Sequence, residues 1–405
     1  MRKNISLEEA QELLMEHCPS LQTGYVGLQD SLGRVLAEDI VAKENIPPFA
    51  RSPYDGYALR AEDTVKASPD SPVGLEIIEE VPAGYAPKKI VLPGTAVKIL
   101  TGAPVPEGAD AVIKFEETEV KDKKVLIFSK LKAGQNVVPA GEDVAQGDKI
   151  ACLGAVISPP LVGLMASLGI TEVPVYERPR IAIISTGDEL LDVYEPLQPG
   201  KIRNSNSYTL AAYCRELEAQ PFILATTRDK KEEVGLRLIE ALEKADMVIT
   251  TGGVSVGDYD VLDEAMEYIG AETLYWKIDI KPGSPNLAAV KGGKVILSLS
   301  GNPAAALVVF HLLGVPYIKK MAGRVDYLHP KIEVTLKNDF SKASPRRRFL
   351  RGKLRLEKGI AFMEVTGGQG NGVLHSMIGC NILAEIPAGS GPLQAGSKLS
   401  AFLLD

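Results

Sequence analysis

Residue types that often carry enzyme chemistry are scarce in this chain of 405 residues. It has only 4 histidines, so its chemistry cannot lean heavily on imidazole. The 4 cysteines, at positions 18, 152, 214 and 380, form no CxxC pair. This scatter argues against a disulfide framework and against a structural zinc site, and it indicates a reducing compartment.

Other absences concern membranes and nucleic acid. The N-terminal residues lack the apolar core of a signal peptide, and we find no apolar run of the roughly 20 residues that would span a bilayer. The net charge of −7 has the wrong sign for a general electrostatic grip on nucleic acid. We therefore expect a cytoplasmic protein whose partners include neither membrane nor nucleic acid.

What the sequence does contain predicts several domains. Ser6 and Glu9 form a capping box that opens a helix over 6–17. Short β-rich runs occupy 52–145, and strands alternate with helices from 180 to 321, which predicts a doubly wound α/β domain with a parallel sheet. Short strands with Gly-rich turns over 331–405 indicate a small β-barrel or sandwich. The fold class is thus α/β plus β.

Polar residues end the predicted strands of the α/β segment, where ligands of such sheets bind. The glycines of TTGGVSVGD, at 250–258, allow close backbone approach to an anion. In SGNP we expect Asn302 to cap a helix and Pro303 to occupy its first turn, so that the helix N-terminus faces a phosphate. Either Gly-rich segment alone could be only a tight turn.

Charged side chains occur in the same segments. Lys277 and Lys281 are four residues apart, a spacing that keeps two side chains of one strand on the same side, and they suit a phosphate or oxyanion; two solvated lysines are the alternative. Carboxylates beside an anion site suit Mg²⁺, although each could be solvated or cap a helix. They are Asp188, Glu189, Asp229, Asp258 and Asp260.

Three residues of the N-terminal half, Asp55, Thr101 and Asp143, lie in turns, and composition alone gives no reason to join them to the α/β site. The basic cluster at 346–351 is open to two interpretations, a solvated strand face or a contact with an anion or partner.

Taken together, PYDGYA, LTGAPVP, GEDV, STGDEL, TTGGVSVGDYD, KPG and SGNPAAA resemble, in order and spacing, the molybdopterin molybdenumtransferase family (the MoeA and gephyrin E-domain family). The resemblance covers nearly the whole chain. It implies four parts: a discontinuous helical segment (1–50 and 144–177), an inserted β-rich domain (51–143), an α/β molybdopterin-binding domain like that of pterin adenylyltransferases (178–326) and a C-terminal β-barrel (327–405). It also implies a homodimer with an active site between the α/β domain of one chain and the inserted domain of the other.

The implied reaction uses adenylylated molybdopterin and molybdate, and releases AMP in a Mg²⁺-dependent final step of cofactor biosynthesis. The resemblance implies that Glu189, Asp229 and Asp260 hold the metal. The implied catalytic set is Asp55, Thr101, Asp143, Glu189, Asp229, Asp260, Lys277 and Lys281. The implied ligand-binding set is Thr186, Gly187, Asp188, Gly252, Gly253, Ser255, Ser300, Gly301, Asn302, Pro303, Arg351 and Ser376.

Two positions depart from the family pattern: Ser300 stands where a proline is usual, and Ser284 where a basic residue is frequent. Molybdate and tungstate are not distinguished at this stage. An adenylyltransferase and a non-catalytic scaffold of the same fold are the alternative functions, and the adenylyltransferase of the pathway is a further candidate partner.

Overall fold

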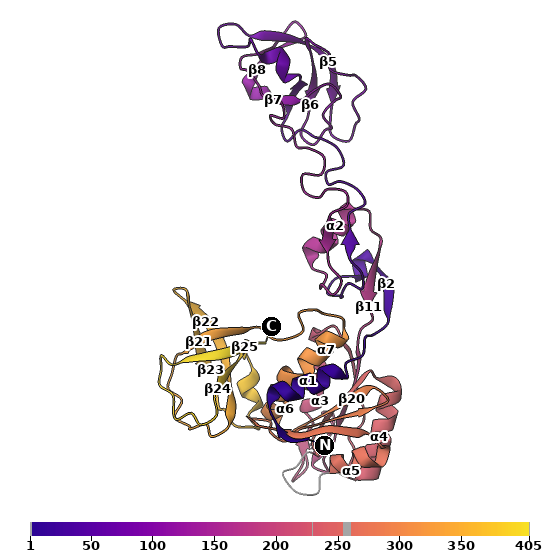
Figure 1. The fold of residues 1–405 in the computed structure, drawn as a ribbon, viewed down its shortest axis with the longest axis vertical. Coiled ribbons are helices and arrows are strands. Elements are labelled where there is room, and N and C mark those ends of the chain that lie inside the picture. The colour runs from indigo at the N-terminus through magenta and orange to yellow at the C-terminus, as the bar shows by residue number, and fades with distance from the viewer. Residues whose placement is uncertain (1, 229, 254–260, 405) are drawn as a thin grey trace.

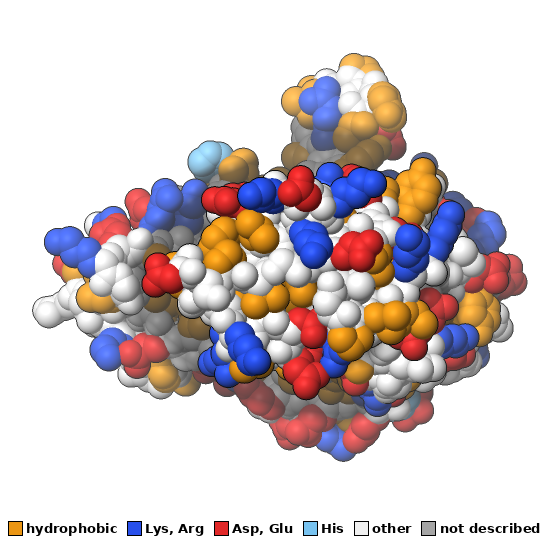
Figure 2. Space-filling model, turned by 90° about the horizontal axis from the view of Figure 1, so that it is seen from above, with side chains coloured by type: hydrophobic (Ala, Val, Ile, Leu, Met, Phe, Trp, Pro, Cys, Tyr) orange, Lys and Arg blue, Asp and Glu red, His pale blue; other side chains and the backbone are white. Residues whose placement is uncertain are grey.

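The computed structural model describes residues 2–228, 230–253 and 261–404. Figure 1 shows an elongated molecule with the inserted β domain at one end of the long axis. A narrow connecting segment leads to the other end, where the α/β domain and the C-terminal barrel lie side by side. On the face seen in Figure 2, acidic and basic side chains are interspersed rather than gathered by sign.

The α/β domain is built on one seven-stranded sheet with the order β1-β17-β19-β20-β16-β12-β15. Strand β19 is antiparallel to both of its neighbours, whereas the other pairs are parallel. The sequence analysis did not predict β19, which joins β20 through Gly292 and Gly293, and so short a turn joins only antiparallel strands. The strands are β1 (Arg2–Ile5), β12 (Arg180–Ser185), β15 (Gln220–Ile223), β16 (Met247–Thr251), β17 (Glu272–Ile278), β19 (Leu287–Lys291) and β20 (Lys294–Leu299).

Helices cover both faces of this sheet, and each face has its own apolar core. The helices are α3 (Asn206–Glu216), α4 (Lys231–Lys244), α5 (Val261–Ile269), α6 (Pro303–Val309) and α7 (Val315–Met321), with a π turn η4 (Phe310–Gly314) joining the last two. The run 303–321 has 19 residues and is apolar enough for a membrane span, so our sequence-based statement about apolar runs missed it. Of an 18-residue stretch of this run, 89% is buried inside the fold, as expected for a core helix.

The N-terminal residues pack with the α/β domain. Helix α1 (Leu7–Glu16) has the predicted capping box: Glu9 N–H donates to Ser6 Oγ at 3.1 Å, and Ser6 N–H donates to Glu9 Oε2 at 2.8 Å. Strand β1, which was not predicted, extends the central sheet beside β17. Residues 2–16 thus lie against the α/β domain, although the sequence analysis grouped them with the rest of 1–50.

The connecting segment and the inserted domain are built separately. The segment contains β2 (Thr23–Gly27), η1 (Leu28–Asp30), β3 (Ile40–Val41), β10 (Lys149–Ala151), α2 (Pro159–Ser167) and β11 (Glu172–Tyr176). The inserted domain has a six-stranded sheet of order β7-β4-β6-β5-β9-β8. Its elements are β4 (Gly56–Leu59), η2 (Ala61–Thr64), β5 (Val73–Val81), β6 (Thr95–Ile99), β7 (Ala111–Lys114), η3 (Phe115–Glu117), β8 (Thr118–Lys121) and β9 (Lys124–Ile127).

The C-terminal strands close into a small barrel, because β22 pairs with both β23 and β24. This confirms the barrel prediction. The short strand β18 of the α/β domain also pairs with β22 and thereby couples the two domains. The elements are β18 (Ile280–Lys281), β21 (Lys331–Leu336), β22 (Arg347–Glu357), β23 (Ile360–Val365), η5 (Leu374–Met377), β24 (Ile382–Ile386) and β25 (Lys398–Leu403).

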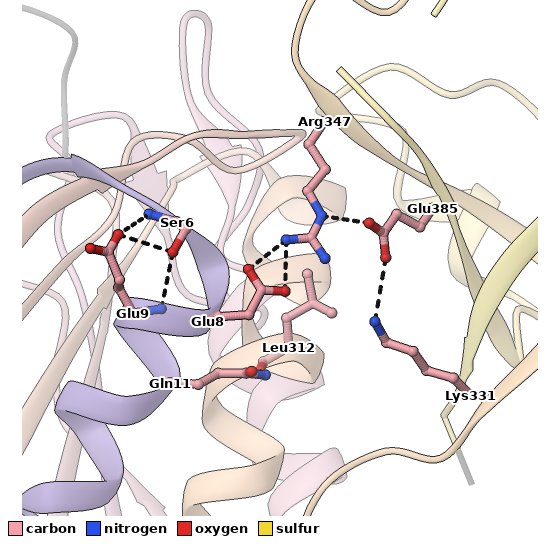
Figure 3. A network of polar contacts seen from close by, with 8 residues as sticks. All are labelled: Ser6, Glu8, Glu9, Gln11, Leu312, Lys331, Arg347 and Glu385. Atoms are coloured by element: carbon pink, nitrogen blue, oxygen red, sulfur yellow. Dashed lines mark hydrogen bonds and ion pairs between the residues drawn. The ribbon is translucent and has the colours of Figure 1, made fainter. Parts of the chain in front are cut away.

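Charged side chains attach the barrel to helix α1 (Figure 3). Arg347 Nη1 donates to Glu8 Oε1 at 2.8 Å and to Oε2 at 2.7 Å. Arg347 Nε forms an ion pair with Glu385 at 2.9 Å, and Lys331 approaches the other oxygen of Glu385 at 3.5 Å. The network thus connects the first helix of the chain to three strands of the barrel, β21, β22 and β24.

Candidate active site at the carboxyl edge of the central sheet

Three polar segments that were singled out from the sequence meet at one edge of the sheet. Strands β12, β16 and β20 are neighbours, with Ser185 opposite Thr251 and Thr251 opposite Leu299. Beyond the strands, Thr186 N–H donates to Thr251 O at 3.0 Å, and Gly252 N–H donates to Leu299 O at 3.2 Å. The segments 185–189, 251–253 and 300–303 therefore form one surface, as expected for an α/β sheet.

Glycine is needed at this edge because the segments approach closely. Gly252 has φ of 93°, and a Cβ there would lie 2.1 Å from the backbone oxygen of Thr186. A Cβ on Gly253 would lie 2.7 Å from Thr186 Oγ1, and one on Gly301 would lie 3.4 Å from Gly252 Cα. These glycines thus have a packing role besides any contact with a ligand.

Asn206, which the sequence analysis missed, ties two of these segments together. Its Nδ2 donates to Thr251 Oγ1 at 2.7 Å and to Gly301 O at 3.0 Å. Thr251 Oγ1 in turn donates to Ser300 O at 3.1 Å. The signal in the sequence was the polar run RNSNS at the start of a predicted helix, which does not follow the end of a predicted strand.

Beneath Asn206 lies a buried polar cluster. Ser185 Oγ and Ser207 Oγ are 2.6 Å apart, and Asn204 Nδ2 donates to Ser207 Oγ at 3.1 Å. Ser185 and Asn204 of this cluster line a narrow cavity of about 60 Å³ that also reaches Thr186 and Gly301. Thr186 Oγ1 is buried and has no hydrogen-bond partner among the described residues, so a donor and acceptor remain for a ligand there.

The SGNP turn has the predicted position but different capping chemistry. Asn302 is the N-cap residue and Pro303 lies in the first turn of α6, yet no cap bond of the Asn302 side chain occurs within the described residues. Instead Asn302 N–H donates to Ser300 Oγ at 3.2 Å. The serine that replaces the usual proline thus orders the turn with its own hydroxyl. The barrel satisfies one helix donor, because Ala305 N–H donates to Asn371 O at 3.1 Å.

The acids after β12 face solvent. Asp188 and Glu189 are exposed, and a Cβ on Gly187 would lie 2.5 Å from Glu189 Oε2, so this carboxylate folds back over the strand end. Lys201, which precedes strand β14 (Ile202–Arg203), donates to the backbone oxygen of Asp188; β14 pairs with β13 (Leu190–Leu191). Asp188 and Lys201 line a cleft of about 710 Å³ together with Arg228.

Four residues named in the sequence analysis, Asp229, Ser255, Asp258 and Asp260, lie outside the described residues. In the part of the chain that is described, no group of three His, Cys, Asp or Glu side chains is placed to hold a metal ion. Glu189 is the described member of the predicted metal set.

Lys281 faces a second cleft, of about 480 Å³, between the α/β domain and the barrel. Arg346 and Asn371 of the barrel and Ser284 of the KPG loop also line it. Ser284 Oγ donates to Ile278 O at 2.8 Å, so the serine that replaces a basic residue orders its own loop. Cationic groups from two domains therefore converge on this cleft.

The spacing argument that placed Lys277 and Lys281 on one face of one strand is wrong. Lys277 has φ of 67°, in the left-handed region, so the alternation of side chains breaks there. Lys281 belongs to β18, opposite Arg348 of the barrel. Lys277 is the penultimate residue of β17 (Glu272–Ile278), and Lys281 follows the carboxyl end of that strand, so each lysine has its own surroundings.

Arg351 and Ser376 meet inside the barrel. Arg351 is fully buried; its Nε donates to Ser376 Oγ at 2.7 Å, and its Nη2 donates to Gly368 O at 3.1 Å and to Gly370 O at 3.0 Å. Burial lowers the pKa of this guanidinium. Its Nη1 has no partner within the described residues. The pair supports the loop that carries Asn371 into the Lys281 cleft.

Within one chain the inserted domain lies at the opposite end of the molecule from the α/β domain (Figure 1). Asp55 Oδ1 accepts hydrogen bonds from Thr101 N–H at 2.7 Å and from Thr101 Oγ1 at 2.8 Å. These bonds hold the pKa of the Asp55 carboxyl below its usual value of 3.8. Asp143 is exposed where the inserted domain joins the connecting segment, and its N–H donates to Ile46 O at 2.9 Å.

Comparison with protein families covers most of the chain. Residues 5–169 match the MoeA N-terminal region (domain I and II), residues 182–320 match a probable molybdopterin binding domain, and residues 333–404 match the MoeA C-terminal region (domain IV).

Individual relatives agree with these matches. The chain is 38% identical over 405 residues to a molybdopterin molybdenumtransferase of Staphylococcus aureus (strain Mu50), which covers 100% of this chain and 96% of that protein. It is 37% identical over 407 residues to the molybdopterin molybdenumtransferase of Bacillus subtilis (strain 168). This match covers 100% of this chain and 95% of that protein. A crystal structure of a molybdopterin biosynthesis MoeA protein from Pyrococcus horikoshii superimposes with a TM-score of 0.87 at 33% identity, over 99% of each chain.

Proposed function

Because this chain belongs to the MoeA family of molybdopterin molybdenumtransferases, we propose that it inserts molybdate into adenylylated molybdopterin and releases AMP. It is a transferase of molybdenum cofactor biosynthesis. Residues outside the α/β domain also match the N-terminal and C-terminal regions of the MoeA family, and these matches do not favour the alternative of an adenylyltransferase.

The observation that carries the proposal is the meeting of anion-binding groups at one sheet edge. The substrates, a phosphoanhydride and molybdate, are both anions and need backbone donors and cations. Thr186, Gly252, Gly253, Gly301, Asn302 and Pro303 would cradle the pterin phosphate. The cleft of about 710 Å³ beside them, with Lys201 and Arg228, has room for the adenylyl group. The boundary between the phosphate cradle and this cleft would be formed by Gly187, Asp188 and Ser300.

Molybdate would bind in the cleft of Lys281 and Arg346, next to the helix that starts at Pro303. Arg351 and Ser376 would act there by supporting the loop of Asn371, and Lys277 would bind a phosphate or the oxyanion. These groups neutralise charge that would otherwise oppose the approach of one anion to another. We also propose a ligand role for Ser255, which follows Gly253 by two residues in the sequence.

Mg²⁺ fits the described donors in chemical type. It takes one or two carboxylates and completes its shell with water and phosphate oxygens. Glu189 supplies an exposed carboxylate, and we propose that Asp229 and Asp260 join it. When bound, the ion would neutralise phosphate oxygens, while the residues of the chain orient the anhydride and the attacking group.

A homodimer would explain how Asp55, Thr101 and Asp143 could join a site on the α/β domain. The inserted domain of one chain would bring them to the sheet edge of the other, and Asp55 would arrive ionised because Thr101 holds its pKa low. We also propose a four-part division with boundaries at residues 50, 143, 177 and 326, in which residues 2–16 of the first part pack against the α/β domain. We further propose a cytoplasmic location, and the adenylyltransferase of the pathway as a source of substrate.

The test supplies purified protein with adenylylated molybdopterin and Mg²⁺, with and without molybdate, and measures AMP. Molybdate-dependent AMP release supports insertion. Product formed from ATP and molybdopterin would instead identify an adenylyltransferase, and no reaction in either assay would leave the scaffold function.

A further inference from the structure

The ammonium group of Lys277 lies over the ring of Trp276, the single tryptophan of the chain. Lys277 Nζ is 3.6 Å from the ring centroid. In the described part of the chain, no carboxylate forms an ion pair with Lys277. Within the described residues, the positive charge of Lys277 is therefore in contact with an aromatic ring and not with a carboxylate. The N–H donors of the ammonium that do not face the ring remain for a ligand.

Packing fixes the ring. Trp276 lies opposite Lys3 of β1 on one side and opposite Leu287 of β19 on the other. Its side chain packs against the apolar core beneath α4 and α5. Its Nε1 is buried and has no hydrogen-bond partner among the described residues, so van der Waals contacts hold the indole in place.

The backbone of Lys277 is fixed too. Its φ of 67° is strained for a residue with a side chain, and such conformations persist where the surroundings impose them, often at functional sites. Lys277 N–H donates to Asn286 O at 2.9 Å, and Asn286 Nδ2 donates to Gly283 O at 2.8 Å. The loop that carries Lys281 thus sets the direction in which Lys277 leaves the strand.

We propose that Trp276 is a positioning residue, whose ring holds the Lys277 ammonium at the sheet edge ready to bind a phosphate or oxyanion group of the substrate. This inference rests on the proposed function. A lysine side chain has a flexible four-carbon stem, and ordering it in advance lowers the cost of binding. A charge-assisted bond to an anion is stronger than a partly exposed cation–π contact, so the ring does not prevent binding.

Because Trp276 is the single tryptophan, its fluorescence reports on its own contact with Lys277. The full chain is titrated with inorganic pyrophosphate, which does not absorb at the excitation wavelength. We expect a saturable change in emission that disappears in Lys277→Met. The matched control is Lys3→Met, because Lys3 Nζ lies over the same ring at 5.4 Å and belongs to the first strand. This variant should keep the response; a response that survives in Lys277→Met would overturn the proposal.

Kinetics separate positioning from packing. Trp276→Leu should raise the KM for adenylylated molybdopterin, if Lys277 binds a phosphate, or for molybdate, if it binds the oxyanion. The expected rise is roughly three- to tenfold with kcat unchanged, because a cation–π contact that only positions a binding group is lost. Trp276→Phe keeps an aromatic face and should show a smaller rise. KM values for both substrates that are the same in the wild type and Trp276→Leu, or equal defects in the Leu and Phe variants, would contradict the inference.

The two proposals fail separately. Molybdate-dependent AMP release with an unchanged KM in Trp276→Leu overturns the role of Trp276 alone. A pyrophosphate response that depends on Lys277, together with no AMP release by the wild type, overturns the proposed reaction and leaves the anion contact standing.

Discussion

The sheet edge of the α/β domain and the surface of the inserted domain both carry predicted catalytic residues, but they are constructed differently. At the edge, segments from three strands and helix α3 are joined by hydrogen bonds and by close glycine contacts. On the inserted domain, Asp55 and Thr101 form an exposed pair held by two hydrogen bonds. The edge is thus a cavity that depends on mutual packing, whereas the pair is a fixed charge that needs a second surface.

The largest expected effect breaks the packing of the edge. Gly252→Ala puts a Cβ 2.1 Å from the Thr186 oxygen and should lower the free energy of unfolding by about 3 kcal/mol, with more than about tenfold loss of activity. Gly84→Ala of the inserted domain is the matched control, because Gly84 also has positive φ but no atom within 4 Å. It should cost about 1 kcal/mol and leave activity intact. Denaturant unfolding measures both; equal losses would contradict the packing account.

A somewhat smaller effect concerns the barrel loop beside the edge. Arg351→Met leaves Ser376 and two loop carbonyls without their donor, so the free energy of unfolding should fall by roughly 1–3 kcal/mol. The KM for molybdate should rise, because the loop that carries Asn371 loses its support. Arg355→Met, on the same strand but with a side chain 51% exposed, is the control. If both variants behave alike in thermal unfolding and kinetics, the buried guanidinium does not support the loop.

A smaller effect still is expected at the junction of α1 and the barrel. Arg347 donates to Glu8 and holds its pKa below 4.5, so the pair stabilises the fold above that pH and the stabilisation is lost as pH falls through the lower, folded value. Glu8 is 55% exposed, so Glu8→Gln should cost at most about 1 kcal/mol at neutral pH and almost nothing in strong acid. Glu12→Gln, exposed on the same helix, serves as the comparison. Unfolding curves at several pH values should show the difference shrinking toward acid.

The smallest change sharpens the description of the inserted domain. Thr101→Val removes a hydroxyl donor from Asp55, so the pKa of Asp55 should rise toward 3.8 while the fold is unaffected. Thr118→Val, whose hydroxyl donates to Phe115 O, should leave that pKa unchanged. Carboxyl NMR titration reads the value directly, and an unshifted Asp55 in Thr101→Val would show that the hydrogen bond does not control its ionisation.

The sequence was sufficient for features that local pattern controls, such as the capped first helix, the strand ends and the C-terminal barrel. It was insufficient where distant segments decide the geometry. Strand β1 and the pairing of β18 with β22 depend on docking of segments far apart in the chain. The left-handed backbone at Lys277 is imposed by the loop to Asn286. Asn206 is identified as a site residue only in the structure, where its side chain bonds segments at the ends of two strands.

The most direct measurement asks whether the two regions meet across a dimer. A chain with Asp55→Asn and a chain with Glu189→Gln carry different tags, are co-expressed, and the heterodimer is isolated. Each homodimer should be inactive in molybdate-dependent AMP release, while the heterodimer should show about half of wild-type activity, because one of its two sites is intact. An inactive heterodimer would contradict the account, since it would mean that Asp55 and Glu189 must act from the same chain.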